Sequence, residues 1–291
     1  MFKFFLLNQI LSKNGDIGFE VIFGLTLNII PIIWTMAIIP KIAAVSYLNT
    51  IPFIYGIEKS NLLEAELLLS PPSECLRNYI DHKVDIALLP VAAVPHLEDT
   101  QIISDYCIGS QGAVRSVVIV SDDPITSLTR IWLDPHSKTS VQLAGYLAEN
   151  HWHISPEWVA LDDYSRLNDS RDGEGFLLIG DKVFEHEGEF EYSYDLSAEW
   201  AESTSMPFTF AVWVARKGTP EQTIDSLNEA LTFGIEHTFE SILEYRADGC
   251  EVDYYEYLTE NIDFIFDGEK RRALQKFWDA GIKIAPKTLP G

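Results

Sequence analysis

The chain has 291 residues, 44 of them acidic and 21 basic, and a formal net charge of −23. A surface this acidic repels phosphate backbones and anionic lipid, which argues against nucleic-acid binding, and the length indicates two domains or one two-lobed unit. The chain has three cysteines and no C-x-x-C pair, so we expect a reducing compartment. Its histidines show no metal-ligand spacing beyond His151-x-His153, so we expect no metal site.

The first 35 residues differ from the rest of the chain. Residues 21–39 carry no charge and are about long enough to span a bilayer, although Asn28, Pro31 and Thr35 weaken that interpretation. A signal peptide fits poorly, because Glu20 precedes the run and no small-residue cleavage site follows it. Met36 stands just before the first predicted strand. We therefore expect residues 1–35 to be an extension from a start codon assigned too early, with a membrane anchor or a genuine docked extension as alternatives.

From Met36 onward, strands and helices alternate. Residues 38–45 are an apolar run typical of a buried first strand, and Pro52 is a favourable first-turn residue for the helix that follows. A second strand is predicted at 64–69, a helix at 70–82 and a third strand at 84–89. This β-α-β-α-β run is the signature of a parallel sheet.

A second series of elements begins after the long β-branched run at 113–120. The sequence predicts strands at 131–133, 158–161, 176–179 and 208–215, a helix at 141–150, and helices throughout the region from 219 onward. The polar stretches 167–174 and 185–191 are expected to be solvated surface.

The runs at 113–120 and 208–215 would carry the chain into and out of its middle segment. This layout predicts an α/β protein with two lobes, a central cleft and two crossing hinge strands. Lobe one would comprise 36–120 together with 211–291, and lobe two would comprise 121–210.

Four polar clusters would face that cleft. In an open α/β sheet, ligands collect at the carboxyl ends of the strands, where three of these clusters lie. At the cluster formed by Ser137, Thr139 and Ser140, hydroxyls and the N–H groups of a helix N-terminus can together hold a carboxylate or phosphate. A simpler interpretation is that these side chains only cap the helices that follow. The clusters are Ser46, Tyr47, Asn49 and Thr50; Ser116 on the first crossing strand; Ser137, Thr139 and Ser140; and Asp181 after Gly180.

Several familiar catalytic motifs are missing from the sequence. It contains no G-x-G-x-x-G, no G-x-x-x-x-G-K-[ST] and no G-x-S-x-G, which removes the usual dinucleotide, P-loop and serine-hydrolase interpretations. The remaining chemistry rests on hydroxyls, amides and backbone dipoles. Such groups suit anion binding, or an elimination in which the substrate supplies much of the reactivity.

The stretch S-Y-L-N-T-x-P-F at 46–53 resembles the menaquinone-biosynthesis enzymes of the futalosine pathway, which have a periplasmic-binding-protein-like fold. The set of motifs is more similar to the chorismate dehydratase branch than to the sister cyclase branch, and only the extension before Met36 departs from the family pattern. The match continues in order with D-I-A-L-L-P-V-A-A at 85–93, G-A-V-R-S-V-V-I-V-S at 112–121, S-K-T-S-V-Q-L at 137–143, L-I-G-D at 178–181 and E-W-A-E-S-T-S-M-P-F-T-F-A-V-W at 199–213.

The resemblance implies a cytoplasmic hydro-lyase without a cofactor, which converts chorismate to 3-[(1-carboxyvinyl)oxy]benzoate. Asn49 matches the asparagine of the motif and would orient the substrate or stabilise the departing hydroxyl. Because an amide is not a credible general base, the proton would pass to a substrate carboxylate. Two alternatives remain open, a non-catalytic binding protein for a small anion and the sister cyclase. The remaining candidates are Ser137, Thr139 and Ser140 for one carboxylate, Ser46, Tyr47, Thr50 and Ser116 for other substrate contacts, and Asp181 as an orienting group.

Overall fold

Two mixed β-sheets, one of six strands and one of five, organise the part of the chain that the structure describes. The computed structural model describes residues 39–169, 172–246, 252–284 and 286–287. The extension expected at 1–35 therefore lies outside the described residues. From residue 39 onward the chain clusters into one compact unit, which contains both sheets.

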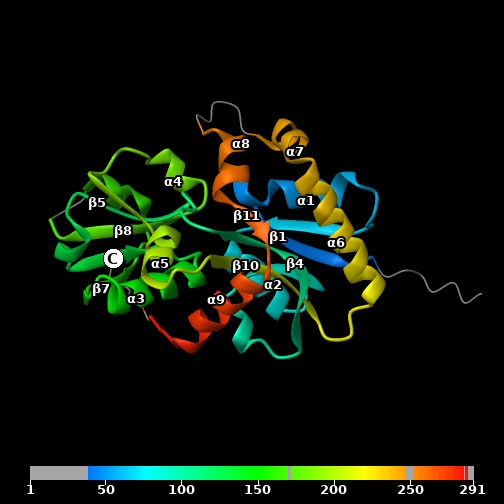
Figure 1. Ribbon diagram of the computed structural model, residues 1–291, viewed down its shortest axis with the longest axis horizontal. Coiled ribbons are helices and arrows are strands. Elements are labelled where there is room, and N and C mark those ends of the chain that lie inside the picture. Colours follow the sequence, from blue (N-terminus) through cyan, green and yellow to red (C-terminus); the bar gives the residue numbers. More distant parts are fainter. Residues whose placement is uncertain (1–38, 170–171, 247–251, 285, 288–291) are drawn as a thin grey trace, which may run out of the picture. The chain divides into compact units, whose positions relative to one another are not determined.

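The first sheet has the strand order β11-β4-β10-β3-β1-β2 (Figure 1). Its strands are β1 (Lys41–Val45), β2 (Glu66–Ser70), β3 (Ile86–Pro90), β4 (Thr100–Ser110), β10 (Phe208–Arg216) and β11 (Asp263–Ile265). β1 pairs in parallel with β2 and β3, as the alternating sequence predicts, whereas β10 runs antiparallel to both β3 and β4. The carboxyl ends of β1 and β3 consequently open at the same edge.

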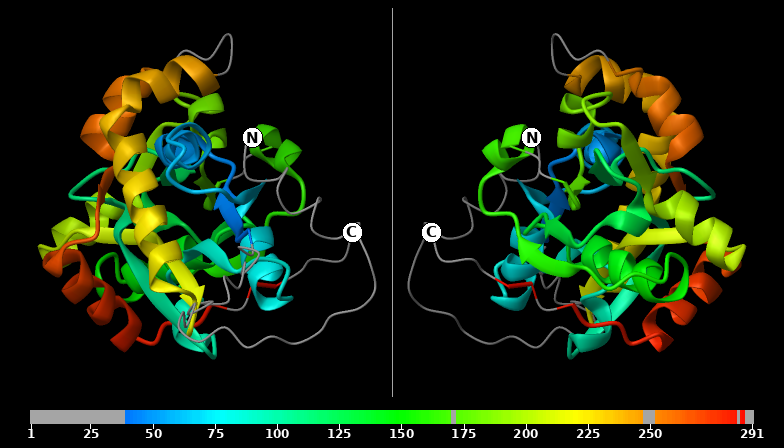
Figure 2. Two further views of the ribbon diagram at one scale, coloured as in Figure 1. Left: turned by 90° about the vertical axis from the view of Figure 1, so that its right-hand side faces the viewer. Right: turned by 90° about the vertical axis from the view of Figure 1, so that its left-hand side faces the viewer.

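The helices packed around the first sheet come from both ends of the chain. They are η1 (Leu48–Thr50), α1 (Ile51–Lys59), α2 (Pro72–Ile80), η2 (Val94–His96), α6 (Glu221–Glu236), α7 (Thr238–Tyr245), α8 (Tyr254–Glu256), the π-helix η5 (Tyr257–Asn261) and α9 (Gly268–Asp279). Helices α1 and α6 lie side by side (Figure 2) and touch through glycines. A Cβ atom on Gly56 would lie 1.9 Å from Ala230 O, and one on Gly234 would lie 1.9 Å from Pro52 O. This backbone contact anchors the start of α1, next to Asn49.

The second sheet has the order β7-β6-β8-β5-β9. Its strands are β5 (Val117–Ser121), β6 (Arg130–Leu133), β7 (Glu157–Ala160), β8 (Glu174–Ile179) and β9 (Tyr192–Asp195). The accompanying helices are η3 (Ile125–Ser127), α3 (Lys138–Asn150), η4 (Tyr164–Asp169), α4 (Lys182–Glu185) and α5 (Leu196–Thr204). As in the first sheet, parallel and antiparallel pairs occur together: β6 is parallel to its neighbours β7 and β8, and β5 is antiparallel to its neighbours β8 and β9.

The chain passes between the sheets at 111–116 and at 205–207, a few residues before the predicted lobe boundaries at 120/121 and 210/211. The strand expected at 113–120 begins only at Val117 and pairs entirely within the second sheet. The strand expected to cross at 208–212 already pairs with β4 in the first sheet from Phe208 onward. We propose that each sheet with its helices forms one lobe, and we use the word lobe in this sense.

Three strands and one buried turn were not predicted from the sequence. β4 mixes buried polar residues, Ser104 and Ser110, with apolar ones and shows no clean alternation, so its pattern did not indicate a strand. β9 and β11 have only four and three residues. The stretch predicted as a solvated loop from 167 begins with Leu167, which is buried at the end of η4.

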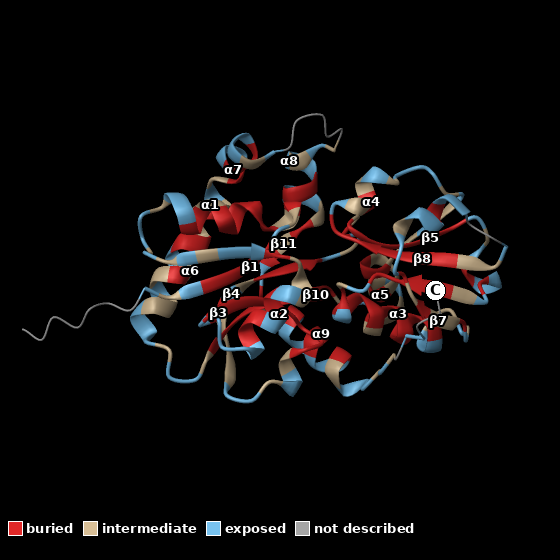
Figure 3. Ribbon diagram, turned by 180° about the vertical axis from the view of Figure 1, so that it is seen from behind, coloured by how far each residue is buried: buried red, intermediate tan, exposed pale blue. Residues whose placement is uncertain are grey.

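The core of the first lobe lies between β1, β3 and β10 and the helices that cover them. Every residue of β3 is buried, and in β10 only the last residue is partly exposed (Figure 3). Phe53 of α1 meets the edges of Trp213 at 5.7 Å and Phe264 at 5.1 Å between ring centroids. Aromatic contacts of this kind lock α1 to the sheet, and α1 carries the first polar cluster at its start.

Candidate functional site

A cavity lies between the two lobes, at the carboxyl ends of strands from both sheets. Val45 and Pro90 end β1 and β3 on one side of the cavity, and Ile179 ends β8 on the other. This position agrees with the edge at which the polar clusters were predicted to meet. The lining residues are Val45, Tyr47, Asn49, Pro72, Pro90, Ile108, Val114, Ser116, Val117, Thr139, Ser140, Ile179, Gly180, Phe210 and Ala211.

The wall of this cavity carries no charged side chain among the described residues that line it. Its polar members are Tyr47, Asn49, Ser116, Thr139 and Ser140, which are all neutral donors or acceptors, and the rest of the wall is apolar. An anionic ligand would therefore be held by oriented dipoles rather than by an ion pair.

Asn49 is held by the residue that follows it. The buried Thr50 hydroxyl donates a hydrogen bond to Asn49 Oδ1 at 3.0 Å. This contact assigns the oxygen of the amide to Thr50 and leaves the Nδ2 donor for the cavity. Neither η1 nor α1 has a side-chain cap, so the capping interpretation is wrong for this turn.

At the start of α3, the three predicted residues have different roles. Ser137 caps the helix by accepting from Ser140 N at 3.2 Å, and it donates to Ser140 Oγ at 2.6 Å. Thr139 Oγ1 donates to Phe210 O at 3.2 Å and accepts from Ala92 N at 3.3 Å, so its hydroxyl joins α3 to the first lobe. Ser140 Oγ accepts from Ser137, which leaves the Ser140 proton free to donate into the cavity.

Ser116 lies in the first crossing segment and is almost fully buried. Ser116 Oγ accepts a hydrogen bond from the Tyr257 hydroxyl at 2.7 Å, so the proton of Ser116 remains available to donate to another group. One arrangement is shared by Asn49, Ser116 and Ser140: each lines the cavity and accepts a hydrogen bond from the hydroxyl of a residue that does not line it. Two hydrogen bonds in series orient the cavity residue and strengthen it as a donor to a ligand.

Sequence reasoning missed Tyr257 entirely. No motif surrounds it, and the π-helical turn that carries it has no signature in the sequence pattern. Its closeness to Ser116 arises only from the tertiary fold.

The other predicted residues lie around the cavity or outside it. Tyr47 lines the wall, and burial, followed by the negative charges of Asp134 and Asp181, raises its pKa, so it remains a protonated donor. Asp181 does not line the wall; its Oδ1 accepts from Leu48 N at 3.0 Å, which links the lobes, and desolvation raises its pKa. The Ser46 side chain is exposed and also lies outside the lining set.

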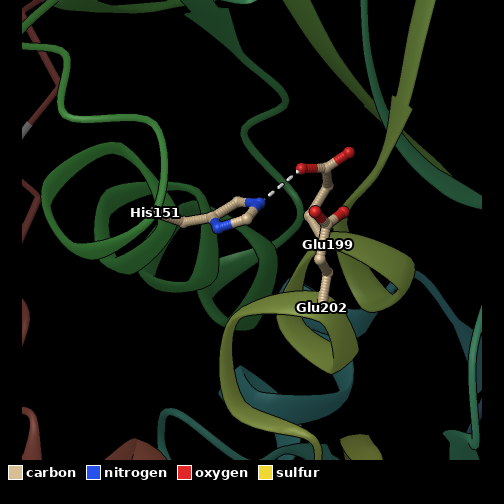
Figure 4. A group of neighbouring side chains, drawn as sticks. All are labelled: His151, Glu199 and Glu202. Carbon is tan, nitrogen blue, oxygen red and sulfur yellow. Dashed lines mark hydrogen bonds and ion pairs between the residues drawn. The ribbon is translucent and has the colours of Figure 1, made fainter.

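A separate cluster at the end of α3 contains residue types that can bind metal ions. Atoms of His151, Glu199 and Glu202 lie within 4.8 Å of one another (Figure 4). Glu199 Oε2 accepts from His151 Nε2 at 3.0 Å and from Trp152 Nε1 at 2.8 Å. These bonds tie α3 to α5, and none of the three residues lines the cavity described above. We interpret the cluster as a structural link between the two helices.

Comparison with known proteins assigns the chain to a family. The family model described as "Menaquinone biosynthesis" matches residues 40–282. The chain belongs to this family. A relative of this menaquinone biosynthesis chain is the chorismate dehydratase of Thermus thermophilus. The two are 26% identical over 247 residues, which cover 77% of this chain and 90% of the relative.

Solved structures show that this menaquinone biosynthesis protein has the fold of periplasmic binding proteins. A protein from Archaeoglobus fulgidus aligns with a TM-score of 0.66 at 15% identity, covering 82% of this chain and 95% of that one. A Candida albicans gene product, described as having the generic periplasmic binding protein fold, aligns with a TM-score of 0.53 at 14% identity, covering 87% and 98%. The alkanesulfonate-binding protein of Xanthomonas axonopodis pv. citri gives 0.57 at 10% identity, covering 83% and 91%. The two-lobed α/β prediction is confirmed.

Among the described residues, no helix combines the length and the apolar character needed to cross a bilayer. The apolar run predicted at 21–39 falls almost wholly outside these residues.

Proposed function

We propose that this member of the menaquinone biosynthesis family is a cytoplasmic chorismate dehydratase, which forms 3-[(1-carboxyvinyl)oxy]benzoate and water. The observation that carries the proposal is the neutral cavity in which Asn49, Ser116 and Ser140 present hydroxyl and amide donors backed by buried hydroxyls. The distant similarity to the chorismate dehydratase of Thermus thermophilus supports the same assignment.

The proposed reaction is a 1,2-elimination across one ring bond of chorismate. The C3–H bond breaks and its electron pair becomes the new ring double bond, while the C4–O bond breaks and the hydroxyl leaves. The departing hydroxide combines with a proton to form water. Because loss of water is redox-neutral, no external oxidant or reductant is needed, and the formation of an aromatic ring supplies the driving force.

Asn49 is the residue we assign to the departing hydroxyl. Its Oδ1 is occupied by Thr50, so Nδ2 is the atom that can donate to a leaving oxygen and stabilise its developing charge. An amide cannot accept the C3 proton, so that proton must pass to another group. In a wall without Lys or Arg, a substrate carboxylate keeps its basicity, because no cation lowers its pKa. We therefore assign the base to a carboxylate of chorismate itself.

The two carboxylates would be held by donors on opposite lobes. The Ser140 hydroxyl and the N-terminus of the 13-residue helix α3 suit one of them. Tyr47 and Ser116 suit the other, and Asp181 would act as an orienting group through Leu48 N. Closure of the lobes would exclude water from the reacting bond and hold the ring in position.

The decisive experiment is incubation of the full-length protein with chorismate. We expect an aromatic product lighter than chorismate by one water, detected by mass spectrometry and ultraviolet absorbance, at a rate well above that of the heat-inactivated protein. Saturable binding of chorismate without any product would instead favour an anion-binding protein of the same fold. The absence of both binding and product would direct the search to the substrate of the sister cyclase.

A further inference from the structure

The Tyr257 hydroxyl is a buried polar group to which the reaction proposed above assigns no bond made or broken. Tyr257 is 1% exposed and begins the π-helical turn η5, directly after the short helix α8. A π-helical turn is rare and is found often at functional sites, because it displaces one side chain from the ordinary helical path.

Tyr257 belongs to the first lobe and contacts groups of the second. Its hydroxyl donates to Ser116 Oγ at 2.7 Å, and its ring meets the edge of Phe184 in α4 at 5.1 Å with an interplanar angle of 80°. Ser116 is bound to the second sheet, because Ser116 O accepts from Gly180 N at 2.8 Å. The Tyr257 hydroxyl thus joins the first lobe to a cavity donor that is fixed to the second sheet.

We propose that Tyr257 is a positioning residue that holds the Ser116 hydroxyl in its reactive orientation when the lobes are together. This inference deepens the proposed function and rests on it. Because Tyr257 donates its proton to Ser116 Oγ, the proton of Ser116 cannot lie along the same line and is directed to another acceptor.

The contacts also determine which kinetic parameter should change. Tyr257 does not belong to the cavity wall, so it makes no direct contribution to ligand binding. Loss of the Tyr257 hydroxyl would leave the Ser116 hydroxyl present but free to rotate away from the ligand. Misorientation of this kind lowers the rate of the chemical step more than it weakens binding of the ground state.

The test is Tyr257→Phe in the full chain, with Tyr106→Phe as the matched control. Tyr106 also forms a hydroxyl–hydroxyl bond, to Thr232 at 2.8 Å, but it lies outside the cavity wall. We expect kcat to fall about 10- to 100-fold in Tyr257→Phe with KM changed by less than about threefold. Tyr106→Phe should retain the parent values. In a Ser116→Ala background, Tyr257→Phe should lower kcat further by much less than it does alone.

Amide hydrogen exchange separates failure of this proposal from failure of the proposed function. A peptide covering residues 113–118 should exchange at least about threefold faster in Tyr257→Phe than in Tyr106→Phe, because Ser116 loses its partner. If the parent turns over chorismate and Tyr257→Phe keeps its kcat, the positioning role is overturned while the function stands. If the parent forms no product, the function fails and exchange decides: equal exchange in the two variants overturns the role of Tyr257.

Discussion

Gly180 and Tyr47 face each other across the cleft, and a Cβ atom on Gly180 would lie 2.9 Å from the Tyr47 ring. Gly180 follows β8 of the second sheet, whereas Tyr47 follows β1 of the first. Gly180 also has a φ of +66°, in the left-handed region that favours glycine. The absence of a side chain at Gly180 is therefore what allows the lobes to meet at this point.

Gly180→Ala should impair the site by holding the lobes apart. We expect kcat/KM to fall by at least about tenfold, because the added methyl group collides with Tyr47 before the cavity donors converge. Gly188→Ala is the matched control, since Gly188 has a φ of +81° but no atom within 4 Å of a built Cβ. Both variants should lose about 1–2 kcal/mol of stability to backbone strain. Thermal unfolding and steady-state kinetics check this, and equal kinetics in the two variants would contradict the contact.

Asn49→Asp should abolish most activity while leaving the fold intact. Aspartate can still accept from Thr50, but when ionised it cannot donate to the leaving hydroxyl. We expect kcat to fall by about 10²–10³-fold, the usual loss for one oriented donor in a closed site. Asn61→Asp, at an exposed position, should retain full activity. Product formation by both variants is the measurement, and an active Asn49→Asp would remove the amide from the mechanism.

Ser140→Ala and Thr139→Val should separate ligand binding from stability at the start of α3. Ser140 has a free proton for the ligand, so its loss should weaken chorismate binding about tenfold, equivalent to about 1.4 kcal/mol. The Thr139 hydroxyl accepts from Ala92 N and donates to Phe210 O, which also accepts from Val91 N. Valine therefore leaves the buried Ala92 N–H unpaired, at about 1–3 kcal/mol of stability. Calorimetric titration and denaturant unfolding measure the two effects. If instead Thr139→Val weakened chorismate binding and Ser140→Ala lowered stability, Thr139 and not Ser140 would face the ligand.

Asp263→Asn should destabilise the protein by about 3 kcal/mol, because it leaves the buried Lys270 without its ion-pair partner. Asp105→Asn is the control, since the Asp105–Arg271 pair is largely exposed and should be worth under about 1 kcal/mol. Urea unfolding at pH 7 gives both values. Equal losses of unfolding free energy in the two variants would show that the buried Asp263–Lys270 pair stabilises the protein no more than an exposed pair does.

The same ion pair predicts how stability depends on acid. Desolvation pushes the pKa of Asp263 upward, but hydrogen bonds from Lys270 and Gln111 outweigh it and hold that pKa below its ordinary value. The stabilisation is therefore complete above the unfolded-state pKa of about 3.9 and is lost as the pH falls through the lower folded value. The stability difference between parent and Asp263→Asn should shrink below about pH 4. A difference that stays constant down to pH 2 would be inconsistent with this linkage.

The sequence by itself determined the local features of the molecule. Apolar runs of strand length marked β1, β3 and β8, and Pro52 marked the start of α1, because periodicity and turn chemistry act over a few neighbouring residues. The edge at which the polar clusters meet followed from the rule that parallel strands end together. Asn49 was therefore identified as a candidate before any contact was known.

Only the tertiary structure decided how the candidates are divided between binding and support. Ser116 and Tyr257 are 141 residues apart in the chain, so no local pattern could pair them. Which hydroxyl faces the cavity, as with Ser140 and not Ser137, depends on how the fold places the start of α3 against the residues of the first lobe. The crossings at 111–116 were likewise settled by strand pairing, because hydrogen bonding between distant segments, and not local propensity, determines which sheet a β-branched strand joins.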